Sequence, residues 1–375
     1  MELRLLLQIE DTTRPTGNPA VNPPNSCVVN NIIHSLFKSV QISLNGTIVS
    51  SDDSNYGYKA YFEDVLSHGN TGTKSILKAQ AFYPDDYHMD SSTDNENPGI
   101  KSRRALFGTY GAYKKVEVIS RLHSDICRID RYLPSGIDVK VSLVKQNPDF
   151  YMMGPNSRGV MKILEANISL DHKVINPEVL YAHHSILNTK NMVIPYRKCG
   201  VKTYTVTAGL SSVSIDNVVL GRIPNTLIFS MANHTSYNGD RSLNPFNLRH
   251  NNIQSFNLIC NGEIIPQKPL YFDYHNAKVS TRGYLSLFKA LGIANSGSGI
   301  IITKERFDNG YFLLAFDLSA DNDTTDQCVS TPQEGAISIE FKLQNPLEQP
   351  ITCLVYTEYD NTLEIDRAKN IFINQ

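Results

Sequence analysis

The chain of 375 residues contains no tryptophan and no long run of apolar residues. A helix that crosses a bilayer needs about 20 consecutive apolar residues, and no segment provides them. The amino terminus carries only a three-leucine run, Leu5–Leu7, which is flanked by Arg4 and Glu10. This run is too short and too polar for the apolar core of a secretory signal, so we expect a protein that is not secreted.

The sequence also lacks closely spaced cysteines, and its net charge is small. The six cysteines are scattered without a Cys-x-x-Cys pair, which excludes the dense disulfide framework of small secreted scaffolds and favours reduced thiols. Lys and Arg number 35 and Asp and Glu number 37, so the net charge is -2. Such a chain has no overall positive field that would concentrate nucleic acid on its surface. We therefore expect no sequence-specific binding of nucleic acid.

The motifs of common catalytic and metal sites are missing. The sequence has no Gly-x-Ser-x-Gly elbow and no His-x-His pair. His183 and His184 lie on a predicted helix, where adjacent side chains point in different directions, so a surface or interface role is favoured over metal binding. His123 and His172 stand alone and are interpreted as hydrogen-bonded polar residues. We predict no catalytic, cofactor-binding or metal-binding residue, and no enzyme activity.

Three kinds of segment resemble known ligand-binding sites only in part. Residues 295–300 are rich in Gly and Ser but lack the Gly-Lys-Ser/Thr of a phosphate loop, so a flexible loop is predicted. Residues 321–326 hold three carboxylates, yet the central Gly and final Glu of a calcium loop are absent, which favours a solvated turn. The basic clusters at 101–104 and 114–115 are short enough for exposed loops, with phosphates or an acidic neighbour as alternative contacts.

What the sequence does contain is a pattern of short strands. Its 41% hydrophobic residues, with 19 Tyr and 15 Phe, are typical of a folded globular protein, and its length favours two domains. Short alternating runs bounded by Gly, Pro, Asn or Asp predict strands at residues 2–8, 40–44, 116–121, 139–144, 162–170, 202–207, 226–230, 256–260, 312–317, 336–343 and 351–356. Helical patterns are confined to residues 58–66, 177–187 and 284–291. The fold class is therefore all-β with short decorating helices.

The two halves of the chain repeat one another. Residues 40–49 align without a gap on 256–265, so each half has a strand, an Asn-Gly turn and a returning apolar pair. Asn-Gly suits the positive φ angles of a type I′ hairpin. Residues 139–148 likewise align on 337–346, and both segments end in Gln-Asn-Pro. A repeat of about two hundred residues has the size of a complete β-sandwich domain with long loops.

These features predict two tandem jelly-roll β-sandwiches. We expect the first jelly roll over residues 1–175, a linker helix over 176–191 and the second jelly roll over 192–375. The linker begins at Asn176-Pro177, where Pro suits an early helical position, and new alternating strands follow it.

Four runs of residues, at 33–46, 58–61, 237–246 and 355–366, resemble the double jelly-roll major capsid proteins of Maverick/Polinton-type and adintovirus-like viruses in order and spacing. The resemblance covers nearly the whole chain. It implies a hexon-type structural protein in which three subunits form a pseudo-hexagonal capsomer of an icosahedral shell. It also implies a virion component that is assembled in the host cytoplasm or nucleus. Its partners are then further copies of itself, neighbouring capsomers, and penton or minor capsid proteins.

The resemblance has two further consequences. Intersubunit contacts are expected in the long loops 84–104 and 237–252. Met1 falls where the family has a leading segment, so the first jelly roll is expected to lack an edge strand or an amino-terminal arm, which leaves a sheet edge exposed. Two other functions stay open: a two-jelly-roll glycan-binding or glycan-active protein, against which the absence of Trp counts, and a host-domesticated protein derived from a capsid.

Overall fold

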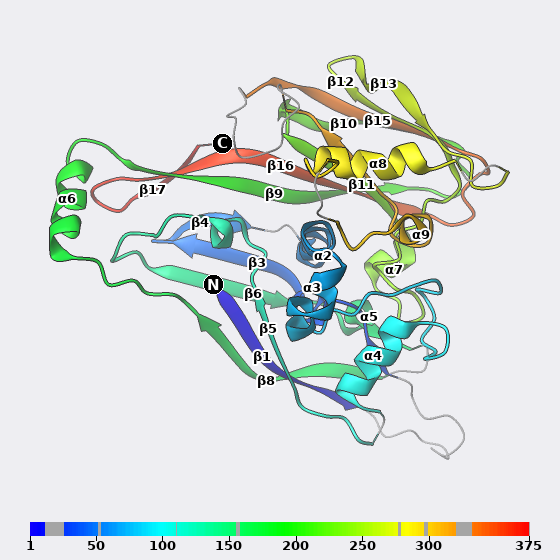
Figure 1. The fold of residues 1–375 in the computed structure, drawn as a ribbon, viewed down its shortest axis with the longest axis horizontal. Helices are drawn as coiled ribbons and strands as arrows, with labels where there is room; N and C mark the ends of the chain where they lie inside the picture. The colour runs from blue at the N-terminus through cyan, green and yellow to red at the C-terminus, as the bar shows by residue number, and fades with distance from the viewer. Residues whose placement is uncertain are drawn as a thin grey trace.

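The structure is a computed structural model of the chain. It describes residues 1–11, 26–51, 54–109, 111–154, 158–276, 279–295, 299–319 and 332–374. These residues form β-sheets decorated by short helices, which confirms the predicted double jelly roll (Figure 1). Among them, no helix combines the length and the apolar character that crossing a bilayer requires.

The first sandwich is built from two three-stranded sheets, ordered β5-β1-β8 and β4-β3-β6. Its strands are β1 (Glu2–Asp11), β3 (Phe37–Leu44), β4 (Thr47–Ser51), β5 (Val116–Arg121), β6 (Val139–Lys145) and β8 (Gly159–Ser169), and the short strands β2 (Cys27–Val28) and β7 (Met152–Met153) pair beside them. In β1, Leu3, Leu5 and Leu7 are fully buried whereas Arg4 is exposed. This alternation arises because successive side chains of a strand point to opposite faces.

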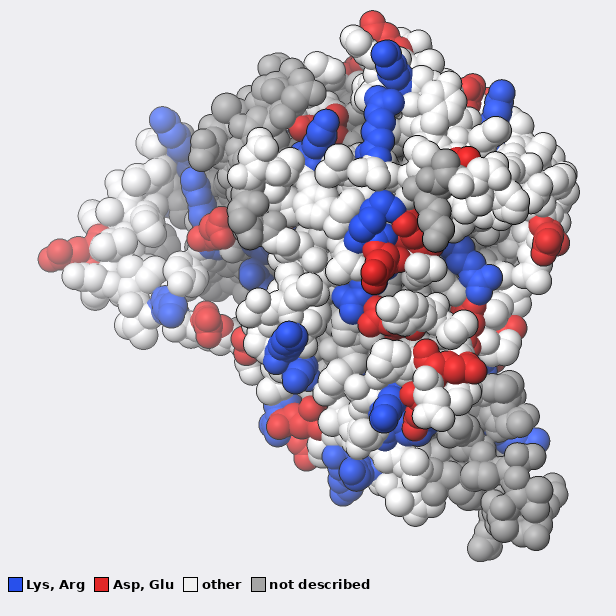
Figure 2. All heavy atoms as spheres, turned by 45° about the vertical axis from the view of Figure 1, so that its right-hand side comes forward, with Lys and Arg blue, Asp and Glu red and all other residues white. Residues whose placement is uncertain are grey.

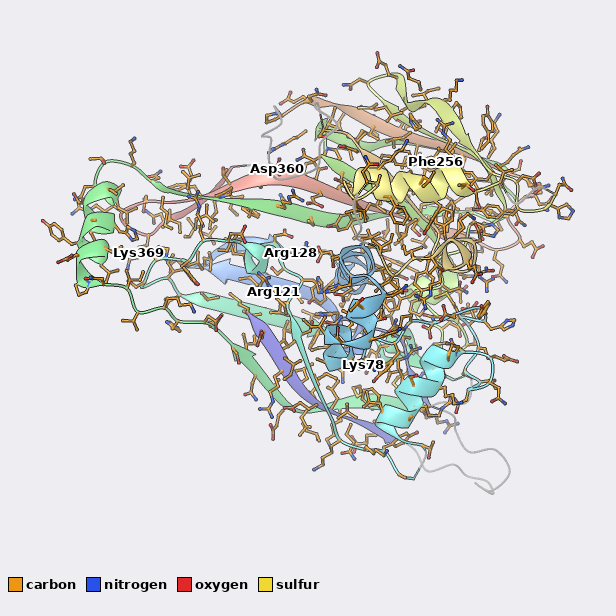
Figure 3. All side chains as sticks on the ribbon, viewed as in Figure 1. Lys78, Arg121, Arg128, Phe256, Asp360 and Lys369 are labelled. Carbon is orange, nitrogen blue, oxygen red and sulfur yellow. The ribbon has the colours of Figure 1, made fainter. Side chains whose placement is uncertain are left out.

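The second sandwich has more strands. One sheet is ordered β10-β15-β12-β13, and in the other β14, β11, β16 and β17 follow one another while β9 also pairs with β16. Its strands are β9 (Met192–Val206), β10 (Ser212–Arg222), β11 (Thr226–Asn233), β12 (Ile253–Cys260), β13 (Glu263–Tyr271), β14 (Leu313–Asp317), β15 (Glu334–Leu343), β16 (Ile351–Ile365) and β17 (Ile371–Asn374). Phe256 of β12 lies in the core of this sandwich, against Phe229 and Phe341 (Figure 3).

The strand pairing repeats between the two sandwiches, as the sequence repeat predicts. The order β5-β1-β8 corresponds to β14-β11-β16, and β4-β3-β6 corresponds to β13-β12-β15. The two Asn-Gly turns also agree, because Asn45 and Gly46 have φ of 46° and 84° and Asn261 and Gly262 have φ of 50° and 86°. These are the positive angles of a type I′ turn. Within the described ranges, β9, β10 and β17 of the second sandwich have no counterpart in the two sheets of the first.

The three predicted helices are present as α2 (Tyr56–Ser67), α6 (Pro177–Leu187) and α8 (Thr281–Ala290). The other helical segments were not predicted: α1 (Ile32–Ser35), α3 (Asn70–Lys74), η1 (Ile76–Gln80), α4 (Pro98–Phe107), η2 (Asp125–Arg128), α5 (Pro148–Tyr151), α7 (His234–Asn238) and α9 (Lys304–Asp308). The longest of these unpredicted helices is α4, and the side chain of Asn97 caps its amino-terminal end. Figure 1 shows α6 at one end of the long strands and α4, α5, α7 and α9 at the opposite end.

Candidate functional site

Helix α2 brings charged side chains into the interior between the two sandwiches. Every residue from Tyr56 to Leu66 is buried, and the set includes Lys59, Glu63 and Asp64. The helix contacts β3 of the first sandwich and β9 of the second. Buried charges are tolerated only when they are paired or hydrogen-bonded, so each of these three needs a partner.

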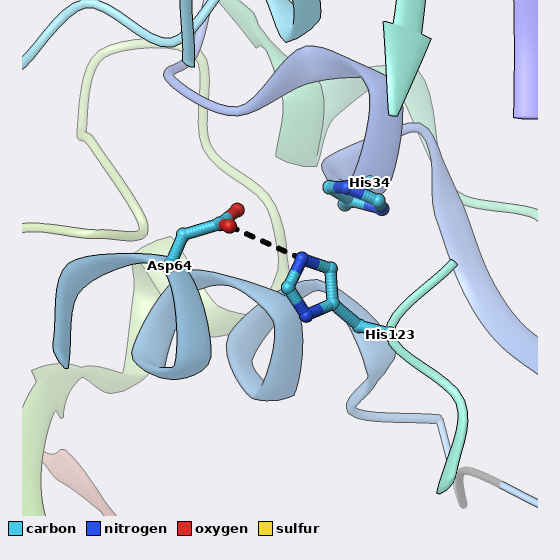
Figure 4. Close-up of side chains that lie close together, drawn as sticks. All are labelled: His34, Asp64 and His123. Atoms are coloured by element: carbon cyan, nitrogen blue, oxygen red, sulfur yellow. Dashed lines mark ion pairs between the residues drawn. The ribbon is translucent and has the colours of Figure 1, made fainter. Parts of the chain in front are cut away.

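His123 is the partner of both carboxylates. Its Nε2 lies 3.2 Å from Oδ1 of Asp64 (Figure 4). Its Nδ1 lies 2.5 Å from Oε2 of Glu63. Asp64 also accepts hydrogen bonds from the side-chain amides of Asn31 at 2.7 Å and Gln80 at 2.8 Å. Two carboxylates on successive residues of one helix thus hold a single imidazole ring.

A second histidine stacks edge-on against the first. The ring centroids of His34 and His123 are 4.6 Å apart. Nδ1 of His34 lies 2.9 Å from the hydroxyl of Tyr56, and its Nε2 lies 2.9 Å from the hydroxyl of Ser120. His34 therefore has neutral hydroxyl partners, whereas His123 has charged carboxylate partners.

This difference sets the charge of each ring. Burial alone would lower the pKa of His123, but the carboxylates of Asp64 and Glu63 outweigh it and raise that pKa to about 9. Burial lowers the pKa of His34 to about 3, and the neighbouring His123 acts in the same direction. Burial would raise the pKa of Asp64, but His123 lowers it to about 2. At neutral pH the cluster thus holds one imidazolium and one neutral imidazole.

The same cluster has the residue types of a metal site. One ligand atom from each of His34, Asp64 and His123 lies within 4.8 Å of the others. Two histidines and a carboxylate are a common ligand set for transition metals. However, all four ring nitrogens already have hydrogen-bond partners in the protein, and a protonated histidine is not a ligand. The geometry fits a closed hydrogen-bonded cluster better, and the absence of a metal site stays a prediction.

The cluster extends into the second sandwich. Glu63 accepts a hydrogen bond from Arg128 of η2, and the hydroxyl of Tyr356 in β16 lies 3.4 Å from its other oxygen. Arg128 lies between the strands of the two sandwiches in Figure 3. Lys59 forms an ion pair with Asp125 at 2.7 Å. These buried charges therefore join the two sandwiches rather than line an open cleft.

A second junction forms between the two long loops that were predicted to contact other subunits. In loop 84–104, Asp85 accepts a hydrogen bond at 3.1 Å from Asn244 of loop 237–252. Asp90 of the first loop accepts one at 2.7 Å from Asn247 and pairs with Arg249 of the second. The loops thus contact each other within one chain, and their role between subunits stays a prediction.

The basic cluster at 101–104 is not an exposed loop, which corrects the prediction. Arg103 is fully buried, where it donates hydrogen bonds to Asp85 at 2.7 Å and to the carbonyl of Val28 at 2.9 Å. Arg104 is also buried and pairs with Asp94. An acidic neighbour was one of the alternative contacts predicted for this cluster. The acidic residues that it contacts belong to the same chain, because α4 turns both guanidinium groups inward.

The remaining candidates are exposed or fall outside the described ranges. His183 and His184 are exposed on α6, and His172 is exposed just before it. Lys114 and Lys115 are exposed, as predicted. Residues 296–298 of the Gly-Ser segment and residues 321–326 lie outside the part of the chain that the structure describes.

Two features of the described surface bear on a nucleic-acid or glycan site. Figure 2 shows Lys and Arg interspersed with Asp and Glu over one face, without a broad patch of one sign. A hollow of about 840 Å³ lies beside α6 and is lined by residues 187–191, Val193, Glu364 and residues 366–368. This lining has no aromatic side chain on which a sugar ring would stack.

Sequence reasoning missed the cluster around α2. Its members come from five segments, and neither His34 nor His123 stands in a recognisable motif. The available signal was Glu63-Asp64 inside a helix otherwise rich in Tyr and Phe. Adjacent carboxylates on a helix that is apolar on most sides indicate buried charge, which requires a cationic partner elsewhere in the chain.

Comparison with known proteins adds to the fold. No family model matches the chain. It is 24% identical over 358 residues to the uncharacterized protein F54H12.2 of Caenorhabditis elegans, covering 92% of this chain and 81% of that protein. Among solved structures, it is similar to a chain of the Sputnik virophage, with 14% identity, a TM-score of 0.57, and coverage of 100% of this chain and 81% of that chain.

Two further structures share the fold over the whole chain. VP54 of PBCV-1, fitted into a reconstruction of the virophage Sputnik, has 10% identity, a TM-score of 0.52 and coverage of 100% of this chain and 89% of that chain. The mavirus major capsid protein has 10% identity, a TM-score of 0.51 and coverage of 100% and 83%. The protein therefore has the double jelly-roll fold of viral major capsid proteins.

Proposed function

We propose that the protein is a major capsid subunit of the Maverick/Polinton type, which forms trimeric pseudo-hexagonal capsomers of an icosahedral shell. The observation that carries the proposal is the duplicated sandwich, which the viral capsid structures share over the full length of this chain. Two similar sandwiches per chain give six similar units in a trimer. Threefold symmetry then yields a nearly sixfold tile.

The domain division follows from the same duplication. In this proposal, residues 1–175 form the first jelly roll, residues 176–191 the linker with α6, and residues 192–375 the second jelly roll. Each of the two larger parts contributes its own pair of sheets. The repeated pairing of corresponding strands supports this division.

Such a capsomer requires that the two sandwiches of each chain keep a fixed position and orientation relative to each other. The buried charges of α2 provide one junction, since Glu63 contacts Tyr356 of the second sandwich and Asp125, the partner of Lys59, accepts a hydrogen bond from the backbone of Cys199 in β9. The contacts between loops 84–104 and 237–252 provide a second one. We infer that the polar junctions serve architecture, and that the protein is structural rather than enzymatic.

The partners in this proposal are further copies of the chain, neighbouring capsomers, and penton or minor capsid proteins. In this proposal the protein is located in the virion, which is assembled in the host cytoplasm or nucleus. Exposed parts of loops 84–104 and 237–252 are proposed to contact other subunits. They lie at the end of the molecule opposite α6, where α4 and α7 are also found (Figure 1).

Electron microscopy of the purified chain in negative stain tests this proposal. A capsid subunit of this type gives uniform particles with a hexagonal outline and threefold averages. A field of single two-lobed particles at every concentration would contradict it. A hydrolytic activity that a single substitution abolishes would also argue against a purely structural protein.

A further inference from the structure

Lys59 and Asp125 are a buried pair of groups that can react with each other. Nζ of Lys59 lies 2.7 Å from Oδ1 of Asp125, and the two side chains are 1% and 7% exposed. Reactions between fixed groups start from separations of about 3–3.5 Å, and an amine in contact with a carboxyl oxygen is within reach of the adjoining carbon. The two components of an amide bond, an amine and a carboxyl group, are therefore held next to each other and away from bulk water.

A backbone donor positions the carboxyl group of Asp125. The backbone N–H of Cys199 in β9 donates a hydrogen bond to the same oxygen, Oδ1, at 3.2 Å. Attack on the carboxyl carbon places negative charge on this oxygen, and a fixed N–H that stabilises the charge lowers the barrier. Burial raises the pKa of Asp125, although Lys59 acts in the opposite direction. The surroundings thus favour the neutral carboxyl group, which is the form that an amine attacks.

Glu63 can accept the proton that the amine of Lys59 has to lose. Both residues are buried in α2, and residues four positions apart lie on the same face of a helix. Burial would raise the pKa of Glu63, but Arg128 and His123 outweigh it and lower that pKa, and Lys59 is close enough to act in the same direction. The carboxylate is therefore ionised at neutral pH and able to take a proton.

We propose that Lys59 and Asp125 join in an isopeptide bond, which the folded chain forms without another enzyme. The nitrogen of Lys59 bonds to the carboxyl carbon of Asp125, and the bond from that carbon to Oδ2 breaks. The ammonium group gives up two of its three protons, Glu63 relays them to the departing oxygen, and one water molecule leaves. An ammonium and a carboxylate thereby become one neutral amide, and the step needs no oxidant, reductant or cofactor.

The interior favours the amide over the ion pair. Two buried charges carry a desolvation cost that a neutral amide does not carry, and a site without bulk water protects the bond from hydrolysis. The bond links α2 to η2, and both elements contact β9 of the second sandwich (Figure 1). It therefore fixes the first sandwich covalently at the junction. This self-modification goes beyond the proposed capsid role and does not require that the chain assembles.

The intact mass of the purified full chain, measured under denaturing conditions, tests the proposal. The expected mass is that of the sequence minus one water molecule, once any removal of Met1 is accounted for. Lys59→Arg keeps the positive charge but replaces the amine by a guanidinium group, which is a poor nucleophile. This variant should have the full mass of its own sequence. Lys101→Arg is the matched control, because Lys101 is exposed, and it should keep the loss of water.

Peptide mapping locates the bond. Trypsin does not cut after an acylated lysine, so the linked chain should give one branched peptide that joins residues 39–74 to residues 122–128. Without the bond, the same digest gives residues 60–74 and residues 122–128 as separate peptides. Fragmentation of the branched peptide should place the link at Lys59.

A pair of carboxylate substitutions tests the proton acceptor. Glu63→Gln is similar in size but takes up no proton, so we expect it to lower the linked fraction roughly tenfold or more. Asp64→Asn is the control, because it removes the other carboxylate that holds His123 but not the one on the face of Lys59. The control should stay linked. Circular dichroism shows whether each variant is folded.

Three results would count against the proposal. An unsubstituted chain with the full mass of its sequence would overturn it, and so would a loss of water that persists in Lys59→Arg, which would place the dehydration elsewhere. A Glu63→Gln chain that is linked as completely as Asp64→Asn would overturn the role of Glu63. The mass of the single chain does not depend on assembly, so these results are independent of the test for capsomers.

Discussion

Charged residues in the interior determine much of how the two sandwiches meet. His123 lies between two carboxylates of α2 and has a pKa raised to about 9, whereas His34 beside it has a pKa lowered to about 3. The sequence interpretation treated His123 as a hydrogen-bonded polar residue, which agrees with its contacts, and it did not single out His34. Their partners were not predictable, because Asp64 and His123 are brought together by the packing of separate segments.

The pH dependence of stability follows from the raised pKa of His123. Since the folded pKa lies above the ordinary value of 6.5, its contribution is complete below about pH 6.5 and is lost as the pH rises through 9. We expect His123→Gln to remove this alkaline loss and to reduce stability at pH 6.5 by on the order of 2 kcal/mol. Urea unfolding at pH 6.5, 8 and 9.5 measures the effect. A variant that loses as much stability as the unsubstituted chain between pH 6.5 and 9.5 would contradict it.

The stability contributed by His34 depends on pH in the opposite direction. Its lowered pKa means that its contribution is present above about pH 6.5 and is lost as the pH falls toward 3, because the unfolded chain then binds a proton that the folded one does not. In His123→Gln the acid-side loss that comes from the burial of His34 should persist, whereas the acid-side loss from Asp64, whose pKa His123 lowers, should shrink.

Arg103 is expected to be far more important for folding than its place in a basic cluster indicated. Arg103→Met leaves Asp85 without its ionic partner in the interior, which typically costs about 3–5 kcal/mol. Lys101→Met on the same helix is the matched control, because Lys101 is exposed. Equal urea midpoints for the two variants would show that the buried ion pair is not needed. The sequence pattern placed Arg103 in an exposed loop, because the carboxylate that accepts its hydrogen bond, that of Asp85, lies 18 residues away.

At the scale of elements, local patterns predicted most strands and the helices α2, α6 and α8. The two Asn-Gly hairpins, α2, α6 and α8 lie where the alternation and the helical periodicity placed them. Strand β10 was missed because its sequence, SVSIDNVVLGR, is interrupted by Asp and Asn at a bulge next to Asn217. Helix α4 was missed because its inward face carries Arg103 and Arg104 between Ile100 and Phe107, which interrupts the apolar pattern. Both misses come from tertiary contacts that override local pattern.

The packing of α8 gives a test at this scale. An alanine usually stabilises a helix by about 1 kcal/mol relative to glycine. At Gly283, however, a Cβ would come within 2.5 Å of the buried ring of Phe272. We expect Gly283→Ala to destabilise the protein by about 1–2 kcal/mol, because the ring has to move in a packed core.

Gly200→Ala is the control for this test, since a Cβ there meets no atom within 4 Å. It should change the thermal midpoint little. A Gly283→Ala chain that is as stable as the unsubstituted one would show that α8 packs less closely on β13 and β14 than the structure indicates.

At the scale of the whole molecule, the internal repeat was the most informative feature of the sequence. It predicted two equivalent sandwiches, and the strand order of both sandwiches bears this out. It did not predict the junction between them, because residues that join two domains are under no local periodic constraint. It also did not predict the strands β9, β10 and β17 of the second sandwich, which have no counterpart among the described residues of the first.

The native mass of the purified chain tests the central claim most directly. Light scattering coupled to size exclusion should be run on the unsubstituted chain over a series of concentrations. A capsid subunit predicts a stable species at three times 41.9 kDa, independent of concentration. A species of 41.9 kDa at every concentration up to the solubility limit would contradict the account.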